Sequence, residues 1–142
     1  MKSYKKMSSP HVAEAKCLST SKAVFEHLKE FMKDFEQDRE YIVLIGLNTR
    51  YNMVYCNIEA IGGMDSVSIE PTLLFKRLIV NNCKYFIIAH NHPSNNTAPS
   101  DADIAFTKRV YKCGEILGVK LLDHVVYSSD FSGYETINNF DY

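Results

Sequence analysis

Apolar residues recur along the chain at helical spacing in three segments. The first segment predicts an amphipathic helix over about residues 21–36, whose apolar face is formed by Val24, Phe25, Leu28, Phe31, Met32 and Phe35. Ser19, Thr20 or Ser21 would cap its beginning.

The other two helices carry terminal signals as well as periodicity. Pro71 stands where a helix tolerates proline, at the first position, and the apolar face that follows contains Leu74, Leu78 and Ile79. The segment "SDADIAFTKRVYKCGEILG" predicts a longer helix from about Ser100, which ends near Gly118.

Runs rich in strand-forming residues lie between these helices. Residues 40–48 and 51–61 are two such runs, and "NTRYN" between them is typical of a hairpin turn. The pair Gly62-Gly63 interrupts the second run, and "SVSI" at residues 66–69 is a candidate short strand. Residues 84–90 and 119–128 predict two more strands, whereas the tail from Asp130 has no clear pattern.

This order of elements predicts a single-domain α/β fold in which helices sandwich a mixed β-sheet. We expect residues 1–20 to be a polar leader and residues 21–142 to form the domain. The length of 142 residues suits one domain with a real core.

Composition and charge narrow the classes of function. The chain is 46% hydrophobic, and its 16 basic and 17 acidic residues give a net charge of -1, so no field gathers nucleic acid. DNA association is therefore not supported by charge. No apolar stretch approaches a membrane span and the first residues lack a signal peptide, so we expect a cytoplasmic protein. Oligomeric state is left open. Four scattered cysteines without a CxxC pair predict free, mostly buried thiols: Cys17, Cys56, Cys83 and Cys113.

Candidate functional residues are most concentrated in the segment "AHNHPSNNTAPSDAD", where an expected buried strand ends on His90 and His92. Alternate residues of a strand share one face, so both imidazoles can reach one ion. Pro93 keeps His92 extended. The pair alone is weak evidence, because His-x-His also occurs in ordinary strands.

Ser100 and Asp103 follow at the expected start of the third helix. Ser-x-x-Asp is typical of a capping box, and taken alone this structural interpretation is the stronger one. It is compatible with a metal site, in which Asp103 is the third ligand and the Ser100 hydroxyl lies close to the ion.

Three protein ligands and one water are the arrangement of catalytic zinc. The ion lowers the pKa of its water from 15.7 to roughly 7. A carboxylate must then take the proton. Spacing does not choose among Glu40, Glu59 and Glu70, each of which is more often a solvated surface residue.

The four-point pattern His-x-His-x7-Ser-x2-Asp resembles the signature of the JAMM metalloproteases, also called MPN-plus or JAB domains. The words "AHNHPS", "GEILGVKLLDHVVY" and "REYIVLIGLN" are similar to the RadC-type branch of that family, and the resemblance covers about residues 21–127. It implies a JAB/MPN fold with cytidine-deaminase-like layering.

The resemblance also implies roles for residues of this chain. His90, His92 and Asp103 would hold one catalytic Zn²⁺ per chain, and Ser100 would stabilise the oxyanion. The general acid/base glutamate of the family stands at the start of the strand after the first helix, which is Glu40 here.

The chain departs from the family pattern at Asn95, where these proteins usually have glycine. Asparagine is among the residues that best tolerate positive φ, so the loop can be kept. Fuller members of the branch carry an N-terminal helix-hairpin-helix segment, which we expect this chain to lack.

The remaining histidines have weaker signals. His124 shares a strand face with Leu122 and Val126, while Asp123 points the other way, so His124 is expected in the core or behind a ligand rather than on the metal. His11 and His27 have no partner pattern.

Three functions follow from these residues. The first is a zinc-dependent hydrolase of peptide or isopeptide bonds, whose partner is a peptide or protein substrate. The second is a metal-binding RadC-like module without peptidase activity, which acts through partners in DNA-repair or mobile-element biology. The third, phosphodiester hydrolysis, is opposed by the near-neutral charge.

Overall fold

The structure is a computed structural model that describes residues 16–36, 38–62 and 69–141. Its helices and strands occur in the order α2 (Ser21–Met32), β1 (Tyr41–Leu47), β2 (Met53–Ile61), α3 (Pro71–Val80), β3 (Tyr85–His92), α4 (Asp101–Leu117), β4 (Lys120–Ser128) and β5 (Tyr134–Ile137). Among the described residues, no helix is both long enough and apolar enough to cross a membrane.

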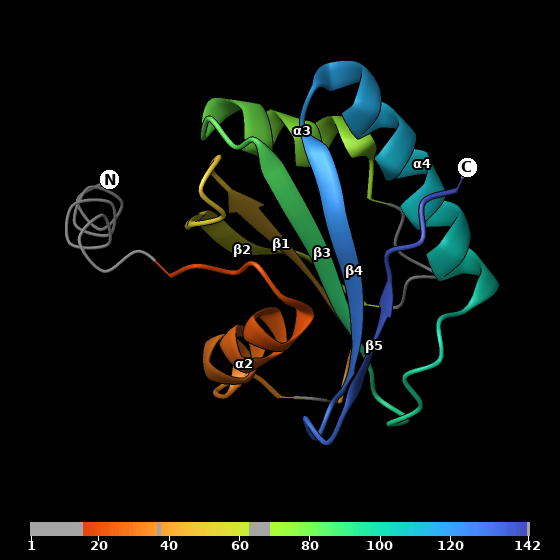
Figure 1. Cartoon of the computed structure of the whole chain (residues 1–142). Helices are drawn as coiled ribbons and strands as arrows, with labels where there is room; N and C mark the ends of the chain where they lie inside the picture. The colour runs from red at the N-terminus through yellow and green to blue at the C-terminus, as the bar shows by residue number, and fades with distance from the viewer. Residues whose placement is uncertain (1–15, 37, 63–68, 142) are drawn as a thin grey trace.

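One five-stranded sheet, in the order β2-β1-β3-β4-β5, runs through the molecule. β3 and β4 are parallel, and the other neighbouring strands are antiparallel. Parallel neighbours require a crossover connection, and α4 supplies it. Figure 1 shows α2 on one face of the sheet and α3 and α4 on the other. The predicted single α/β domain with a mixed sheet is confirmed.

Each face of the sheet has its own apolar core. The α2 face packs a cluster that includes Leu28, Met32, Val43, Ile45 and Val125. The opposite face packs α3 and α4 against a second cluster, which includes Leu44, Leu74, Leu78, Phe86 and Val110. Because both faces are covered, β1 and β3 read as nearly continuous apolar runs rather than alternating ones.

Terminal signals placed most helix ends correctly. Thr20 caps α2 by accepting a hydrogen bond from the Ala23 amide at 3.1 Å. Gly118 follows α4 in the left-handed conformation, with φ of 78°. The predicted first helix is too long, however, because α2 ends at Met32 rather than near residue 36.

Some expectations about the strands and faces were wrong. The tail, which had no clear pattern in the sequence, contains the four-residue strand β5, whose residues do not alternate regularly in burial. Ile79 was expected on the apolar face of α3, but 52% of its surface is exposed. Leu122 lies against the α2-face cluster rather than beside His124. An irregularity in the β3–β4 register, where Asp123 rather than Leu122 pairs with Ile87, breaks the alternation of side chains there.

The hairpin between β1 and β2 is confirmed, and the second run does end at Gly62, whose φ of 128° suits glycine. The candidate strand "SVSI" falls mainly outside the described residues.

Candidate metal centre

The two histidines of the motif are presented by the last residues of β3. His90 is fully buried and His92 is half-buried, and their Nε2 atoms lie 3.1 Å apart. The pairing of β3 with β1 places Ile42 opposite His90. Glu40 lies two residues before Ile42, directly before β1, so the alternation of an extended chain turns its side chain toward the histidines.

The start of α4 brings a carboxylate to the same point. Ser100 is the N-cap: its Oγ accepts from the Asp103 amide at 3.0 Å, and its own amide donates to Asp103 Oδ2 at 2.8 Å. This capping box fixes the first turn of the helix and the direction of the Asp103 side chain. Asp103 Oδ1 lies 3.1 Å from His90 Nε2, and Oδ2 lies 3.3 Å from His92 Nε2.

These atoms fit a tetrahedral zinc ion. Ligand atoms held at about 2.0–2.1 Å from zinc are about 3.3 Å from one another, close to the 3.1 Å between the two Nε2 atoms and to the distance from each ring to its nearer Asp103 oxygen. Asp103 Oδ1 is moreover buried without a hydrogen-bond partner in the described part of the chain. His92 Nδ1 donates to the Asn96 carbonyl at 2.6 Å, so in a neutral ring Nε2 is a lone pair that faces the carboxylate. A cation would satisfy this convergence of acceptors.

Glu40 is the fourth group at this point. One ligand atom from each of Glu40, His90 and His92 lies within 4.8 Å of the others, which makes these three a candidate metal triad. Glu40 is half-buried, whereas Asp103 is fully buried. The structure therefore brings together all three residues expected as ligands, and places the expected glutamate beside them.

The other two glutamates considered from sequence lie elsewhere. Glu59 was expected on the surface, but its side chain is only 3% exposed and forms an ion pair with Arg77 at 3.6 Å. Its carboxylate also accepts a hydrogen bond from Tyr55. Glu70 is exposed immediately before α3.

Burial and neighbouring groups control the ionisation of the centre. Burial by itself raises the pKa of Asp103, but the adjacent His90 ring and the hydrogen bonds with Ser100 outweigh it and hold that pKa below its usual value. Burial lowers the pKa of His124 well below its usual range, so this ring is neutral. The centre therefore combines an ionised Asp103 carboxylate, the form that zinc binds, with a neutral His124 behind His90.

Sequence reasoning missed Asn91, which holds the segment that carries Glu40. Asn91 is fully buried between the two histidines in sequence. Its Oδ1 accepts from the Tyr41 amide at 2.7 Å, and its Nδ2 donates to the Arg39 carbonyl at 2.8 Å. These bonds fix the backbone on both sides of Glu40, beyond the last β1–β3 pair. The available signal was a third polar residue, between the two histidines, at the end of a strand that begins with an apolar run.

Asn95 adopts φ of 63°, so the residue that replaces the usual glycine does take the left-handed conformation. His124 is fully buried, and its Nε2 lies 2.8 Å from His90 Nδ1, behind the candidate ligand. Thr107, which drew no attention in the sequence, contacts the other nitrogen of His124.

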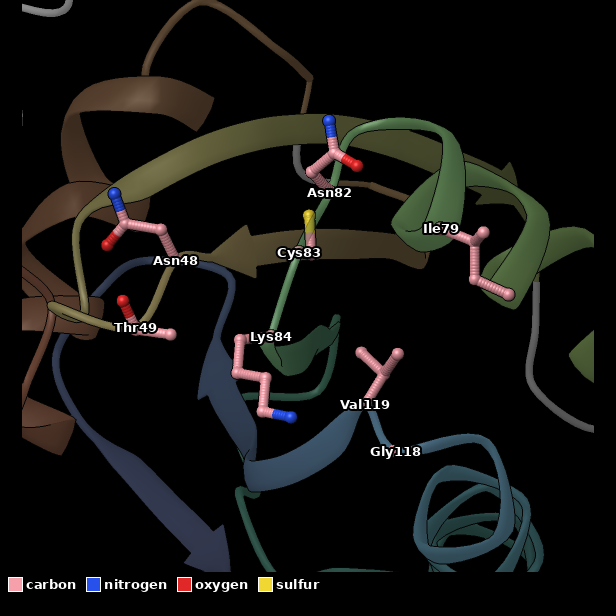
Figure 2. Close-up of a pocket in the computed structure, with 8 residues that line it drawn as sticks. All are labelled: Asn48, Thr49, Ile79, Asn82, Cys83, Lys84, Gly118 and Val119. Atoms are coloured by element: carbon pink, nitrogen blue, oxygen red, sulfur yellow. The ribbon is translucent and has the colours of Figure 1, made fainter.

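A separate hollow of about 470 Å³ lies at the opposite end of the sheet. Figure 2 shows that Lys84 before β3 and Gly118 and Val119 before β4 line it, together with Asn48 from the hairpin. It contains none of the candidate ligands, which follow the carboxyl end of β3. We therefore assign no part of the candidate metal centre to it.

Comparison with known proteins identifies the family of the domain. A model of the RadC-like JAB domain matches residues 18–136. The chain belongs to this family. It is 34% identical over 117 residues to a UPF0758 protein of Enterococcus faecalis, which covers 82% of this chain and 49% of that protein. It is 30% identical over 125 residues to one from Clostridium acetobutylicum, which covers 88% of this chain and 51% of the relative.

A UPF0758 protein of Carboxydothermus hydrogenoformans is 44% identical over 88 residues, or 62% of this chain and 39% of that protein. This RadC-like JAB domain thus spans about half the length, or less, of the curated relatives it matches.

Proposed function

We propose that the domain is a zinc-dependent metallohydrolase of the JAMM type, which cleaves peptide or isopeptide bonds with an activated water. The convergence of His90 Nε2, His92 Nε2 and the Asp103 carboxylate within 3.1–3.3 Å, with Asp103 Oδ1 left without a hydrogen-bond partner among the described residues, is the observation that supports it. Membership of the RadC-like JAB domain family agrees with this chemistry.

We assign Asp103 rather than Glu40 as the third ligand. Asp103 is the more deeply buried of the two, and each ring nitrogen lies 3.1–3.3 Å from one of its two oxygens, close to the edge length of a zinc tetrahedron. Glu40 lies within 4.8 Å of the ring nitrogens, which suits a carboxylate that contacts a water at the open position. Catalytic zinc sites keep such a position open.

Bound zinc would polarise the scissile carbonyl and lower the pKa of a water molecule toward neutrality. Glu40 accepts the proton of that water and transfers it to the leaving amine. Ser100 uses an oxygen lone pair for the helix cap, so its hydroxyl hydrogen can donate to the oxyanion that forms on the substrate. The capping role and the catalytic role of Ser100 therefore use different parts of one hydroxyl group.

The test compares Glu40→Gln with Glu70→Gln, an exposed control immediately before α3. Zinc-loaded wild type is incubated with a library of peptides and isopeptide-linked conjugates, and cleavage is read by mass spectrometry. We expect Glu40→Gln to lose cleavage by about 10²–10⁴-fold while it keeps zinc, and Glu70→Gln to behave as wild type.

Zinc-loaded wild type that leaves the whole library uncut would contradict the hydrolase. Capture of a specific protein or DNA by that inactive, zinc-loaded chain would instead support a binding module without peptidase activity. A gel assay with single- and double-stranded DNA and Zn²⁺ or Mn²⁺ tests phosphodiester hydrolysis, for which we expect no cleavage because the chain carries a net charge of -1.

A further inference from the structure

Two buried polar side chains lie behind His90, on the side away from His92. His124 in β4 and Thr107 in α4 are both fully buried. His90 Nδ1 lies 2.8 Å from His124 Nε2, and His124 Nδ1 lies 2.5 Å from Thr107 Oγ1. A histidine that binds a metal usually donates its second ring N–H to a carboxylate, a carbonyl or water. A second histidine as the acceptor, as His124 is here, is unusual.

The direction of the hydrogen bonds in this row is fixed at its far end. Thr107 Oγ1 lies 2.6 Å from the Asp103 carbonyl oxygen, which can only accept, so the hydroxyl hydrogen of Thr107 is donated there. Thr107 Oγ1 is then an acceptor toward His124. The hydrogen between Thr107 and His124 must therefore belong to His124 Nδ1.

The same reasoning continues to the ligand. A neutral imidazole carries one N–H, so His124 with a protonated Nδ1 has a lone pair on Nε2. The 2.8 Å contact then requires the hydrogen to be on His90 Nδ1. In a ring that carries one hydrogen, His90 Nε2, the atom 3.1 Å from Asp103 Oδ1, is then left with its lone pair.

We propose that Thr107 and His124 are positioning residues that fix the tautomer of His90, so that its Nε2 presents a lone pair to a metal ion before the ion arrives. The value of this tautomer rests on the proposed zinc site, but the tautomer itself is a property of the metal-free protein. Without the hydrogen bonds from Thr107 through His124, His90 Nε2 can carry the hydrogen. That hydrogen must then move to Nδ1 before Nε2 can bind zinc.

Thr107 allows a test in which a hydrogen-bonding role and a packing role predict opposite orders of zinc affinity for two variants. Thr107→Val keeps the shape of the side chain and removes the hydroxyl, whereas Thr107→Ser keeps the hydroxyl and removes a methyl group. We expect Val to weaken zinc affinity by about 10–100-fold and Ser to stay close to wild type. If the serine variant is weakened as much as the valine variant, or more, Thr107 acts through packing and the proposal is overturned.

His124 is tested in the same way. Glutamine has a carbonyl oxygen that can accept from His90 and an amide that can donate to Thr107, whereas leucine has neither. We expect His124→Gln to keep most of the affinity and His124→Leu to lose about 10–100-fold. Equal losses in both variants, with both folded, would contradict the proposal.

The direct readout is the ¹⁵N chemical shifts of the His90 ring in metal-free protein at pH 8. We expect Nδ1 to be protonated in wild type and the two tautomers to mix in Thr107→Val. An Nε2-protonated or doubly protonated ring in wild type would overturn the relay. Failure of wild type to bind zinc while His90 shows the expected tautomer would remove the hydrolase alone, so the two proposals fail separately.

Discussion

Replacement of Asp103 by asparagine separates two effects of this side chain: its effect on the stability of the metal-free protein and its effect on zinc binding. In the metal-free protein, Asp103 Oδ1 is buried without a hydrogen-bond partner among the described residues and lies 3.1 Å from His90 Nε2. Asparagine places an N–H₂ donor there, while its own oxygen can still accept from the Ser100 amide. Alanine removes the unsatisfied oxygen too, but it also removes the cap.

The expected change in the free energy of unfolding differs between protein in chelator and protein in excess zinc. An unsatisfied buried acceptor costs about 1–3 kcal/mol, but this cost opposes the favourable contacts with His90 and Ser100 that hold the pKa of Asp103 low, so Asp103→Asn in chelator should stay close to wild type in stability. Asp103→Ala should be less stable than Asp103→Asn by about 1 kcal/mol or more, because the capping box is lost. Zinc at a thousand times its dissociation constant adds about 4.1 kcal/mol to wild type, or about 8–16 °C in Tm.

The assay is thermal unfolding of wild type, Asp103→Asn, Asp103→Ala and Asp101→Asn, each in chelator and in excess zinc. Asp101 is an exposed acid in the same helical turn, so Asp101→Asn controls for charge at the helix start. We expect Asp103→Asn to stay close to wild type in chelator and to be clearly less stable in zinc. Equal stabilisation of both proteins by zinc, or a loss in chelator as large as that of Asp103→Ala, would refute the reasoning.

Three further predictions concern the fold around the centre. Gly114→Ala should lower the free energy of unfolding, measured in urea, by about 1–3 kcal/mol, because a Cβ there would lie 2.3 Å from the Val119 carbonyl oxygen. The loss is expected although alanine favours a helix more than glycine does. Gly133→Ala, where the space is open, should change the free energy of unfolding by less than about 0.5 kcal/mol. Burial, assisted by a nearby lysine, lowers the pKa of His27 to about 4. As pH falls, the unfolded chain therefore binds a proton at this residue before the folded one does, and stability should fall by about 1–2 kcal/mol between about pH 6.5 and 4. A His27→Gln variant that shows the same fall would contradict this. Asn91→Ala should cost about 2–4 kcal/mol and expose the backbone beside Glu40 to rapid hydrogen exchange, and unchanged protection of that segment would contradict the clamp.

Much of this arrangement could be read from local pattern. Alternation in a strand places His90 and His92 on one face, and the capping box at Ser100 and Asp103 marks the start of α4. These features depend on residues close together in the chain, where backbone geometry decides the outcome. Glu40 was selected through resemblance alone, since its approach to the histidines depends on the antiparallel pairing of β1 and β3.

The parts that were missed depend on contacts between distant segments. Leu122 was placed on the wrong face because a change of register in β4 does not show in the alternation of the sequence. Thr107 reads as an ordinary helical residue, although it lies one turn after Asp103 and so shares its face of α4. Its contact with His124 becomes visible only when α4 is packed on β4. The short strand β5 lies in a polar tail, where four residues give too little periodicity.

The most direct measurement is anomalous diffraction at the zinc edge from crystals of the metal-loaded protein. We predict one ion at about 2.0–2.2 Å from His90 Nε2, His92 Nε2 and an Asp103 carboxylate oxygen, with Glu40 outside bonding distance. An ion held by Glu40 and the two histidines with Asp103 turned away would contradict the assigned ligand set. No ion at this end of β3 would contradict the metal centre itself.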